Sequence, residues 1–314
     1  MNRRRFARTL GISILASGLG RASFGLSANS PPRIAVTMDD PGTGPSPKLT
    51  AEERNRAILG ALRANSSLKA ALFVCGKRVD SAEGRQLLRA WDVEGHTLAN
   101  HSYSHLYYHS AKVSTEAFAQ DILRGEAVVK EFRHFTKLFR YPYLKEGDSV
   151  GKRDAARAFL KQNGYRNGHV TIDASDWYVD ERMRGRLGRD PNADLSPYRE
   201  FYLNHIWERA TFYEGLARRV LGRTVSHTIL IHHNLLNALY LGDLLRMFKS
   251  RGWKLINADE AFRDPVFASA PNIVPAGESI VWALAKETGK FENLLRYPGE
   301  DGRYEKDRMD KLGL

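Results

Sequence analysis

The most constraining feature of this sequence is a repeated alternation of short apolar runs with longer amphipathic stretches. The runs at 33–38, 70–75 and 228–231 have the length and the branched or aromatic content of buried strands, and a further short strand is predicted over 169–172. Between the runs lie segments with helical periodicity, and Thr50-x-x-Glu53 forms a capping box that opens a helix to about residue 64. Strands that alternate with helices predict an α/β fold with about seven parallel strands.

Ionisable residues follow the ends of these apolar runs. In chain order they are Asp39 and Asp40, His101 and His105, Arg140, Asp173 and Asp176, and His232 and His233. A barrel gathers the carboxyl ends of its strands around one mouth, where barrel enzymes place their chemistry, whereas an open sheet spreads them along a line. We therefore predict a distorted (β/α) barrel whose mouth carries the functional site.

Two regions depart from this rhythm. Residues 180–197 are polar and contain Gly and Pro, which predicts a long surface loop at the border of the cleft. Three arginines in this region could contact an anionic substrate, namely Arg182, Arg184 and Arg186. Beyond Asp264 a short helix is predicted over 279–286, and the mainly charged residues after 298 are expected to be flexible. The predicted organisation is a domain over 29–265 and a C-terminal extension over 266–314.

The first 28 residues have the pattern of an export signal. A basic start, Arg3-Arg4-Arg5-Phe6, is followed by a short and weakly apolar run with small residues. That run is too short for a membrane-spanning helix, which needs about 20 apolar residues. The Arg-Arg-x-Phe pattern resembles a bacterial twin-arginine signal. We therefore expect an exported protein, periplasmic or extracellular, with no membrane span once residues 1–28 are removed.

Composition limits the classes of partner. The formal charge is +12, and subtracting the five arginines of the signal leaves +7 for the remaining chain. These positive charges are scattered and no nucleic-acid motif is present, so we predict no nucleic-acid partner and expect affinity for an anionic surface or polymer. One cysteine, Cys75, lies in a strand pattern, which excludes an intrachain disulfide and indicates a core residue.

The segment His101-Ser102-Tyr103-Ser104-His105 brings two imidazoles together after an apolar run. Imidazole is the commonest protein ligand for zinc, but two imidazoles do not complete a site. Asp39-Asp40 follows another predicted strand, and one of its carboxylates could supply a third ligand while leaving an open position. Successive residues of an extended chain point in opposite directions, so the other carboxylate could remain free as a base.

Such a site suits the hydrolysis of an acyl group. Water bound to a catalytic metal has its pKa lowered to about 7, and a nearby carboxylate could take its proton as it attacks a carbonyl carbon. The leaving amine or alkoxide needs a proton from the opposite side. His232, at the end of another predicted strand, could supply that proton.

Five ordered motifs resemble those of a known family. They are Thr37-Met38-Asp39-Asp40, His101-Ser102-Tyr103-Ser104-His105, Arg140-Tyr141-Pro142-Tyr143, Asp173-Ala174-Ser175-Asp176-Trp177 and Leu230-Ile231-His232. In this order, across about residues 33–260, the sequence resembles the polysaccharide deacetylases of carbohydrate esterase family 4, which share the NodB-homology domain. Met38 stands where the family usually has Phe, and His233 follows the motif histidine where a simpler residue is usual.

The resemblance implies both the fold and the roles of the site residues. The implied fold is a distorted (β/α) barrel, and the implied cofactor is a divalent metal, usually Zn²⁺, with Co²⁺, Fe²⁺ or Ni²⁺ as alternatives. The implied roles are metal ligation by Asp40, His101 and His105, base catalysis by Asp39 with Arg140, acid catalysis by His232 with Asp176, and acyl-group binding by the Tyr143 backbone and Trp177.

The sequence therefore predicts an exported, metal-dependent hydrolase that removes acetyl groups from an N-acetylated or O-acetylated saccharide, with an acetylated glycan as its partner. Two alternatives remain. One is a carbohydrate-binding protein with a degenerate site. The other is a metal-dependent amide hydrolase acting on a non-sugar substrate, because barrel enzymes share one architecture across many chemistries.

Overall fold

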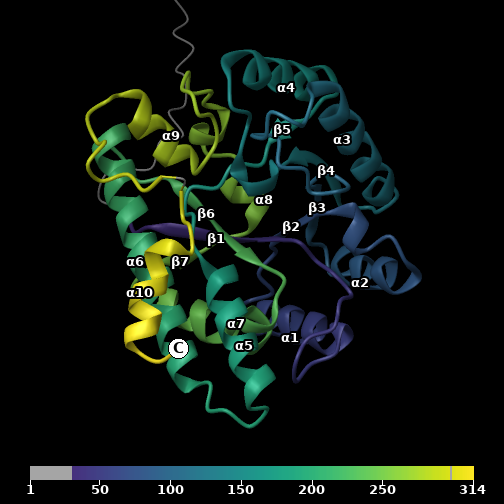
Figure 1. The fold of residues 1–314 in the computed structure, drawn as a ribbon, viewed down its shortest axis with the longest axis vertical. Coiled ribbons are helices and arrows are strands. Elements are labelled where there is room, and N and C mark those ends of the chain that lie inside the picture. Colours follow the sequence, from purple (N-terminus) through teal and green to yellow (C-terminus); the bar gives the residue numbers. More distant parts are fainter. Residues whose placement is uncertain (1–29, 298) are drawn as a thin grey trace, which may run out of the picture.

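Seven parallel strands form one curled sheet at the centre of the described chain, as the prediction of an α/β fold requires (Figure 1). The computed structural model describes residues 30–297 and 299–314, so the predicted signal over residues 1–28 lies outside the described residues. The strands are β1 (Arg33–Asp39), β2 (Ala71–Val74), β3 (Thr97–Asn100), β4 (Phe135–Phe139), β5 (Arg166–Asn167), β6 (Ser226–His232) and β7 (Lys254–Leu255). Their order is β5-β4-β3-β2-β1-β6, and β7 pairs with β1.

The segment after β5 closes the sheet into a distorted barrel. β5 pairs with β4, and the chain then crosses to β6, where Ile172 bridges Ile229 in parallel. The Leu230 N–H donates to the carbonyl of Ile172 at 3.0 Å. A strand was expected over 169–172, but the structure has this single bridge instead. The reason is that residues 169–172 span the gap between β5 and β6, which we call the seam, and pair fully with neither strand.

Helices surround the barrel (Figure 1). They are α1 (Ala51–Ala64), α2 (Ala82–Val93), α3 (Thr115–Val129), α4 (Val150–Gln162), α5 (Asp176–Arg189), α6 (Ser196–Leu221), α7 (Leu235–Ser250), α8 (Ala258–Ala261), α9 (Ile280–Glu287) and α10 (Arg303–Lys311), with the short 3₁₀ turns η1 (Gly76–Arg78), η2 (Pro142–Leu144) and η3 (Pro265–Ala268). The predicted capping box is present, because the Glu53 N–H donates to the Thr50 hydroxyl and the Thr50 N–H donates to the Glu53 carboxylate. No helix in the described ranges is long and apolar enough to cross a bilayer.

The barrel interior is filled at the end opposite the site. Small side chains such as Ala35 and Ala71 point inward beside Phe73, and Phe262, at the end of α8, packs edge-on to Phe73 with ring centres 6.4 Å apart. Because α8 fills this amino-terminal end of the strands, the mouth at their carboxyl ends remains available for a site.

The predicted surface loop over 180–197 is wrong for most of its length. Helix α5 continues to Arg189, and Val179, Met183 and Leu187 recur every four residues on its buried face. The Gly, Arg and Asp content of this segment concealed that narrow apolar stripe. The helix also carries the ion pair Arg184–Asp180 at 3.8 Å, one turn apart.

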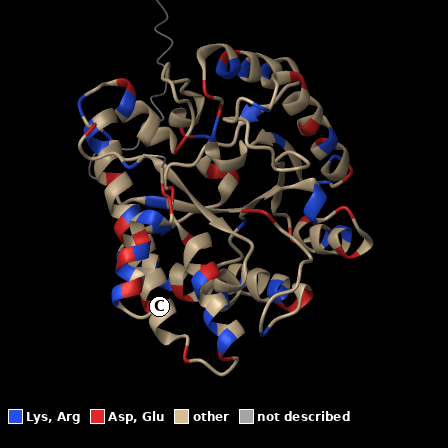
Figure 2. Cartoon of the chain, in the orientation of Figure 1, with Lys and Arg blue, Asp and Glu red and all other residues tan. Residues whose placement is uncertain are grey.

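The C-terminal residues were expected to be flexible, but 303–311 form α10, which packs beside α6 (Figure 1). Met309 is fully buried, and Arg308 pairs with Glu208 of α6 at 2.7 Å. Figure 2 shows that positively and negatively charged residues are mixed along both helices. Some charges after residue 298 pair with residues more than 90 positions away, as Arg308 does with Glu208 and Asp310 with Arg182, and local composition does not reveal such pairs.

Candidate active site

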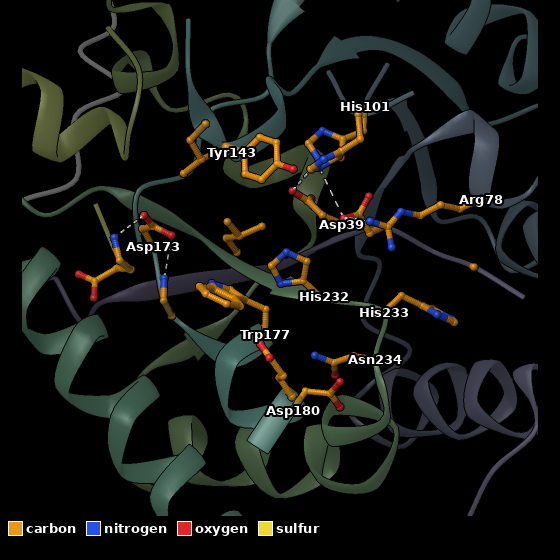
Figure 3. Close-up of a pocket in the computed structure, with 18 of the residues that line it drawn as sticks. Asp39, Arg78, His101, Tyr143, Asp173, Trp177, Asp180, His232, His233 and Asn234 are labelled. Atoms are coloured by element: carbon orange, nitrogen blue, oxygen red, sulfur yellow. Dashed lines mark hydrogen bonds and ion pairs between the residues drawn. The ribbon is translucent and has the colours of Figure 1, made fainter. Parts of the chain in front are cut away.

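A cleft of about 1110 Å³ opens at the carboxyl ends of the strands (Figure 3). The residues predicted for the site line this cleft or lie directly behind it. The lining residues among them are Asp39, Asp40, His101, His105, Tyr143, Trp177 and His232. Arg140 and Asp176 are buried behind this wall and hydrogen-bond to residues that line it. The barrel therefore brings all nine predicted residues into one neighbourhood.

Asp40, His101 and His105 form a compact triad. One potential ligand atom from each lies within 4.8 Å of the others. Asp40 follows β1 with a left-handed φ of 60°, which turns its carboxylate away from the direction of Asp39. His105 also has a left-handed φ, 58°, and its N–H donates to the Ser102 hydroxyl at 3.1 Å. The local backbone thus folds the two imidazoles toward one carboxylate.

The donor atoms of the triad suit a divalent metal ion. The Nδ1 of His101 donates to the Arg140 carbonyl at 2.8 Å, which leaves Nε2 for a ligand. Burial lowers the pKa of both His101 and His105 to about 4, so both rings are neutral at pH 7. Asp40 Oδ1 is buried and has no hydrogen-bond partner among the described residues. Two imidazoles and one carboxylate with further positions open are the donor set of a catalytic zinc site.

Asp39 lies beside the triad and is fixed by Arg140. Arg140 Nη1 donates to Asp39 Oδ1 at 2.5 Å, Nη2 donates to the Thr37 hydroxyl, and Nε donates to the Gly168 carbonyl. The guanidinium also lies 3.7 Å above the centre of the Phe73 ring. Burial raises the pKa of Asp39 to about 6, although Arg140 opposes that rise. Asp39 is therefore oriented and is able to accept a proton near neutral pH.

His232 forms the opposite wall with Asp176 (Figure 3). Its Nδ1 lies 2.8 Å from Asp176 Oδ1, and its backbone N–H donates to Asp176 Oδ2 at 2.8 Å. Burial alone would lower the pKa of His232, but the Asp176 carboxylate raises it to about 9. The imidazole is therefore protonated at neutral pH and presents its Nε2 to the cleft.

His233 has a different environment. Its Nε2 lies 3.1 Å from Asn55 Oδ1, and its ring packs 6.2 Å from Trp91. Burial lowers the pKa of His233 to about 3, so this ring is neutral. Figure 3 shows the two histidine side chains pointing apart. His232 is thus the one of the pair that faces the cleft centre.

Tyr143 and Trp177 lie on opposite sides of the cleft mouth (Figure 3). Tyr143 has a left-handed φ of 57°, and its ring lies 4.7 Å from that of His105. Its backbone N–H has no hydrogen-bond partner among the described residues. Trp177 is held in the first turn of α5, directly after Asp176, and remains 39 % exposed. Both side chains can contact a bound substrate.

Of the three arginines expected near a substrate, Arg184 lines the cleft. Arg182 instead pairs with Asp310 at 2.7 Å, and Arg186 pairs with Asp190 at 3.5 Å. These two pairs follow from the helical conformation of 176–189, which turns the arginines in different directions.

Sequence reasoning missed several supporting residues. Asn237 donates to both Asp176 Oδ2, at 2.8 Å, and the His232 carbonyl, at 2.9 Å. Arg78 lies 3.3 Å from Asp40 Oδ2, and the C-terminal extension contributes Glu278 to the cleft. Asn234 and Asn237 stand three residues apart just after the last motif. This spacing was a detectable sequence signal for a helix cap beside the site. No sequence signal pointed to Arg78 or Glu278, because only the closed barrel brings these two residues to the site.

Comparison with known proteins agrees with this geometry. The family model described as polysaccharide deacetylase matches residues 27–168. A peptidoglycan-N-acetylglucosamine deacetylase of Bacillus cereus is 26% identical over 230 residues, which cover 73% of this chain and 88% of that protein. The chain is thus similar to polysaccharide deacetylases over residues 27–168 and, at 26% identity, over 230 residues.

Solved structures share the fold of this chain. The chitin deacetylase from Colletotrichum lindemuthianum aligns with a TM-score of 0.51 and 20% identity, covering 75% of this chain and 89% of that chain. A mutant of a CE4 family pseudoenzyme with restored enzymatic activity aligns with a TM-score of 0.52 and 16% identity, covering 75% and 68%. The chain thus shares the distorted barrel of these structures, and Asp40, His101 and His105 form its candidate metal site.

Proposed function

We propose that this protein is an exported polysaccharide deacetylase that removes N-acetyl groups from aminosugars of a glycan. The observation that carries the proposal is the placement of Asp39 and His232 on two sides of the Asp40–His101–His105 triad. One side offers an oriented carboxylate and the other a protonated imidazole. Hydrolysis of an amide needs both, because water must lose a proton and the departing nitrogen must gain one.

The triad would hold the divalent metal, with Zn²⁺ the best match to two imidazoles and one carboxylate. Such an ion, when bound, lowers the pKa of water and polarises the acyl carbonyl. The chain supplies the remaining groups. Asp39 Oδ2, the oxygen not bonded to Arg140, is the proton acceptor for the attacking water. The unpaired N–H of Tyr143 is available to donate to the oxyanion that forms on the acyl group.

Collapse of the tetrahedral intermediate breaks the C–N bond and releases acetate and an amine. His232 donates its Nε2 proton to that nitrogen, and Asp176 stabilises the imidazolium beforehand. The apolar Leu230 and Trp177 line the same cleft and offer surface to the acetyl methyl group. A His232 pKa of about 9 keeps the imidazole protonated, which an amide substrate requires in particular, because a nitrogen anion is a far poorer leaving group than an alkoxide and the nitrogen must gain a proton as the C–N bond breaks.

The test is acetate release from a panel containing N-acetylglucosamine oligomers, peptidoglycan, O-acetylated xylan and a small cyclic amide. We expect release from the N-acetylated glycans, inhibition by a chelator and recovery with Zn²⁺ or Co²⁺. Asp39→Asn should abolish release while the purified protein still binds Zn²⁺. Cleavage of the cyclic amide alone, or of the xylan alone, would contradict the proposal.

Export is tested separately. Replacing Arg3 and Arg4 together by Lys preserves the charge of the segment and removes the arginine pair. We expect the variant to accumulate in the cytoplasm of a bacterial host, whereas the unchanged chain leaves it. Equal distribution of the two proteins would contradict a twin-arginine signal.

A further inference from the structure

The loop that carries Tyr143 has a backbone conformation that other parts of the chain must hold in place. Tyr143 and the adjacent Leu144 have left-handed φ values of 57° and 56° in the turn η2. Such conformations are disfavoured for residues with a side chain and persist only where the surrounding structure fixes them. The conformation matters because in it the Tyr143 N–H has no hydrogen-bond partner among the described residues and is available to a substrate.

A segment of the C-terminal extension pairs with this loop in the antiparallel sense. The Glu278 N–H donates to the Leu144 carbonyl at 2.9 Å, and the Glu146 N–H donates to the Ala276 carbonyl at 3.1 Å. We call residues 275–278 the strap. The two bonds hold the backbone directly after Tyr143, so the strap restrains the direction in which the loop leaves the cleft.

The strap lies so close to the loop that Gly277 has no room for a side chain. Gly277 forms an antiparallel bridge with Lys145 and has a left-handed φ of 115°. An added Cβ would overlap the carbonyl oxygen of Leu144. The Lys145 ammonium also pairs with the Glu278 carboxylate, and both side chains are almost wholly buried. Strap and loop are thus joined by backbone bonds and by one buried ion pair.

The strap is itself anchored to the barrel. The Ser279 hydroxyl donates to the Thr171 carbonyl, and the Ile280 N–H donates to the Val170 carbonyl, each at 2.8 Å. These two carbonyls belong to the segment that spans the seam. Helix α9 begins at the same point and buries Trp282. Because the strap is fixed to the barrel on one side, it can hold the loop on the other.

We infer that the strap positions the Tyr143 N–H for the oxyanion, with Gly277 and Glu278 as positioning residues. A hydrogen-bond donor stabilises a developing charge best when its direction is fixed before the reaction. The inference rests on the proposed function, which assigns the oxyanion to this N–H. The strap lies outside residues 27–168, the part matched by the family model, so this support comes from the C-terminal extension.

The test separates the chemical step from substrate binding. Acetate release from N-acetylglucosamine tetramer is measured for the full chain loaded with Zn²⁺ and for Gly277→Ala, whose Cβ must displace the loop. Because an oxyanion donor acts in the transition state, we expect kcat to fall about tenfold while KM changes less than about twofold. Zn²⁺ affinity should be unchanged, since none of the three ligand residues lies in the strap or in the loop.

Matched variants separate positioning from general loss of stability. Gly289→Ala, in the same extension, also places a side chain at a left-handed φ, but nothing lies within 4 Å of its Cβ. It should lower the thermal midpoint of unfolding and retain kcat. Glu278→Gln keeps the strap backbone and removes the charge that pairs with Lys145, so it should lower kcat by a smaller factor. Glu292→Gln breaks the exposed pair with Lys286 and should leave kcat unchanged.

Three results would overturn the inference. They are an unchanged kcat in Gly277→Ala, a rise in KM alone, and a loss of Zn²⁺ affinity that parallels the loss of kcat. If Gly277→Ala does not fold, Glu278→Gln decides: a lower kcat at unchanged KM supports the inference, and an unchanged kcat overturns it.

A failure of the proposed function gives a different pattern. If the unchanged chain releases no acetate from any glycan, the strap is judged by hydrogen exchange of the backbone. The Glu146 N–H is bonded to the strap, so it should exchange faster in Gly277→Ala than in the unchanged chain or in Gly289→Ala. That result would support the hold of the strap on the loop without the activity, and equal exchange in the three proteins would overturn it.

Discussion

Asp176 determines the protonation of His232 through two hydrogen bonds and one negative charge. Its Oδ1 accepts from the imidazole and its Oδ2 from the backbone of the same residue, each at 2.8 Å. Asn237 also donates to Oδ2, so the carboxylate is fixed before any substrate arrives. The ring is therefore ready to act as an acid because its partner, rather than its own exposure, sets its charge.

Replacing Asp176 by Asn should shift the alkaline limit of activity. The folded-state pKa of His232 is raised from the ordinary 6.5 to about 9, so the protonated form persists through neutral pH and is lost as the pH rises through that value. Without the Asp176 charge, burial lowers the pKa and the proton is lost at lower pH. The pH profile of kcat should show its alkaline limb displaced downward.

The matched control for that substitution is Asp190→Asn, which removes an exposed carboxylate of the helix end paired with Arg186. Its alkaline limb should coincide with that of the unchanged enzyme. An Asp176→Asn profile with an unmoved alkaline limb would show that His232 is not the acid.

Arg140→Met should unfold the enzyme more easily as well as inactivate it. The guanidinium and Asp39 are both almost wholly buried, so the variant leaves a carboxylate in the interior without its partner. Breaking a buried pair in this way costs about 3–5 kcal/mol. Urea unfolding followed by circular dichroism measures that loss. Arg89→Met, at an exposed position on α2, should change stability by less than about 0.5 kcal/mol.

At the scale of elements, α3 supports the loop that carries His101 and His105. Gly125 of α3 has no room for a side chain, because an added Cβ would lie 2.6 Å from Asn100 Oδ1 and 2.6 Å from the Ser102 backbone. Asn100 Oδ1 in turn accepts from the Ser102 N–H, and the Ser102 hydroxyl accepts from the His105 N–H. The positions of both imidazoles thus depend on a close approach between the helix and the loop.

Gly125→Ala should therefore weaken Zn²⁺ binding and lower the thermal midpoint of unfolding. The measurement is competition for Zn²⁺ with a chelating dye, together with a thermal scan. Gly215→Ala on α6 is the control, because nothing lies within 4 Å of its added Cβ. That change should leave Zn²⁺ affinity unaltered and raise stability by about 0.5–1 kcal/mol through helix propensity. Unchanged Zn²⁺ affinity in Gly125→Ala would contradict the support role.

The elements that sequence predicts well are those with strong local patterns. The buried strand β1 and the capped helix α1 depend on neighbouring residues, so their boundaries follow from spacing alone. Helix α5 was missed because only Val179, Met183 and Leu187 mark its buried face among many polar residues. The seam at 169–172 could not be derived either, since Ile172 pairs with a strand more than 50 residues later.

At the scale of the whole molecule, closure of the barrel makes the site. Asp39 and His232 are the last residues of β1 and β6, and His101 directly follows β3. Parallel pairing in a common direction places these strand ends together. That part was predictable from where the ionisable residues fall in the chain. The contribution of the C-terminal extension was not, because α10 is held by pairs such as Arg308–Glu208 that join distant segments.

Metal binding should couple the site to the stability of the entire fold. The triad joins the ends of β1 and β3, and its ligand atoms approach one another only when the barrel is closed. A ligand that binds the folded chain alone stabilises it by about 2.7 kcal/mol at a concentration 100 times its Kd. Adding Zn²⁺ to chelator-treated protein should therefore raise the thermal midpoint of unfolding in a concentration-dependent manner.

Asp40→Asn, which replaces the carboxylate by a neutral amide, should lose most of that rise, whereas Asp307→Asn at an exposed position of α10 should retain it. A Zn²⁺-induced rise of equal size in Asp40→Asn would show that the ion binds elsewhere.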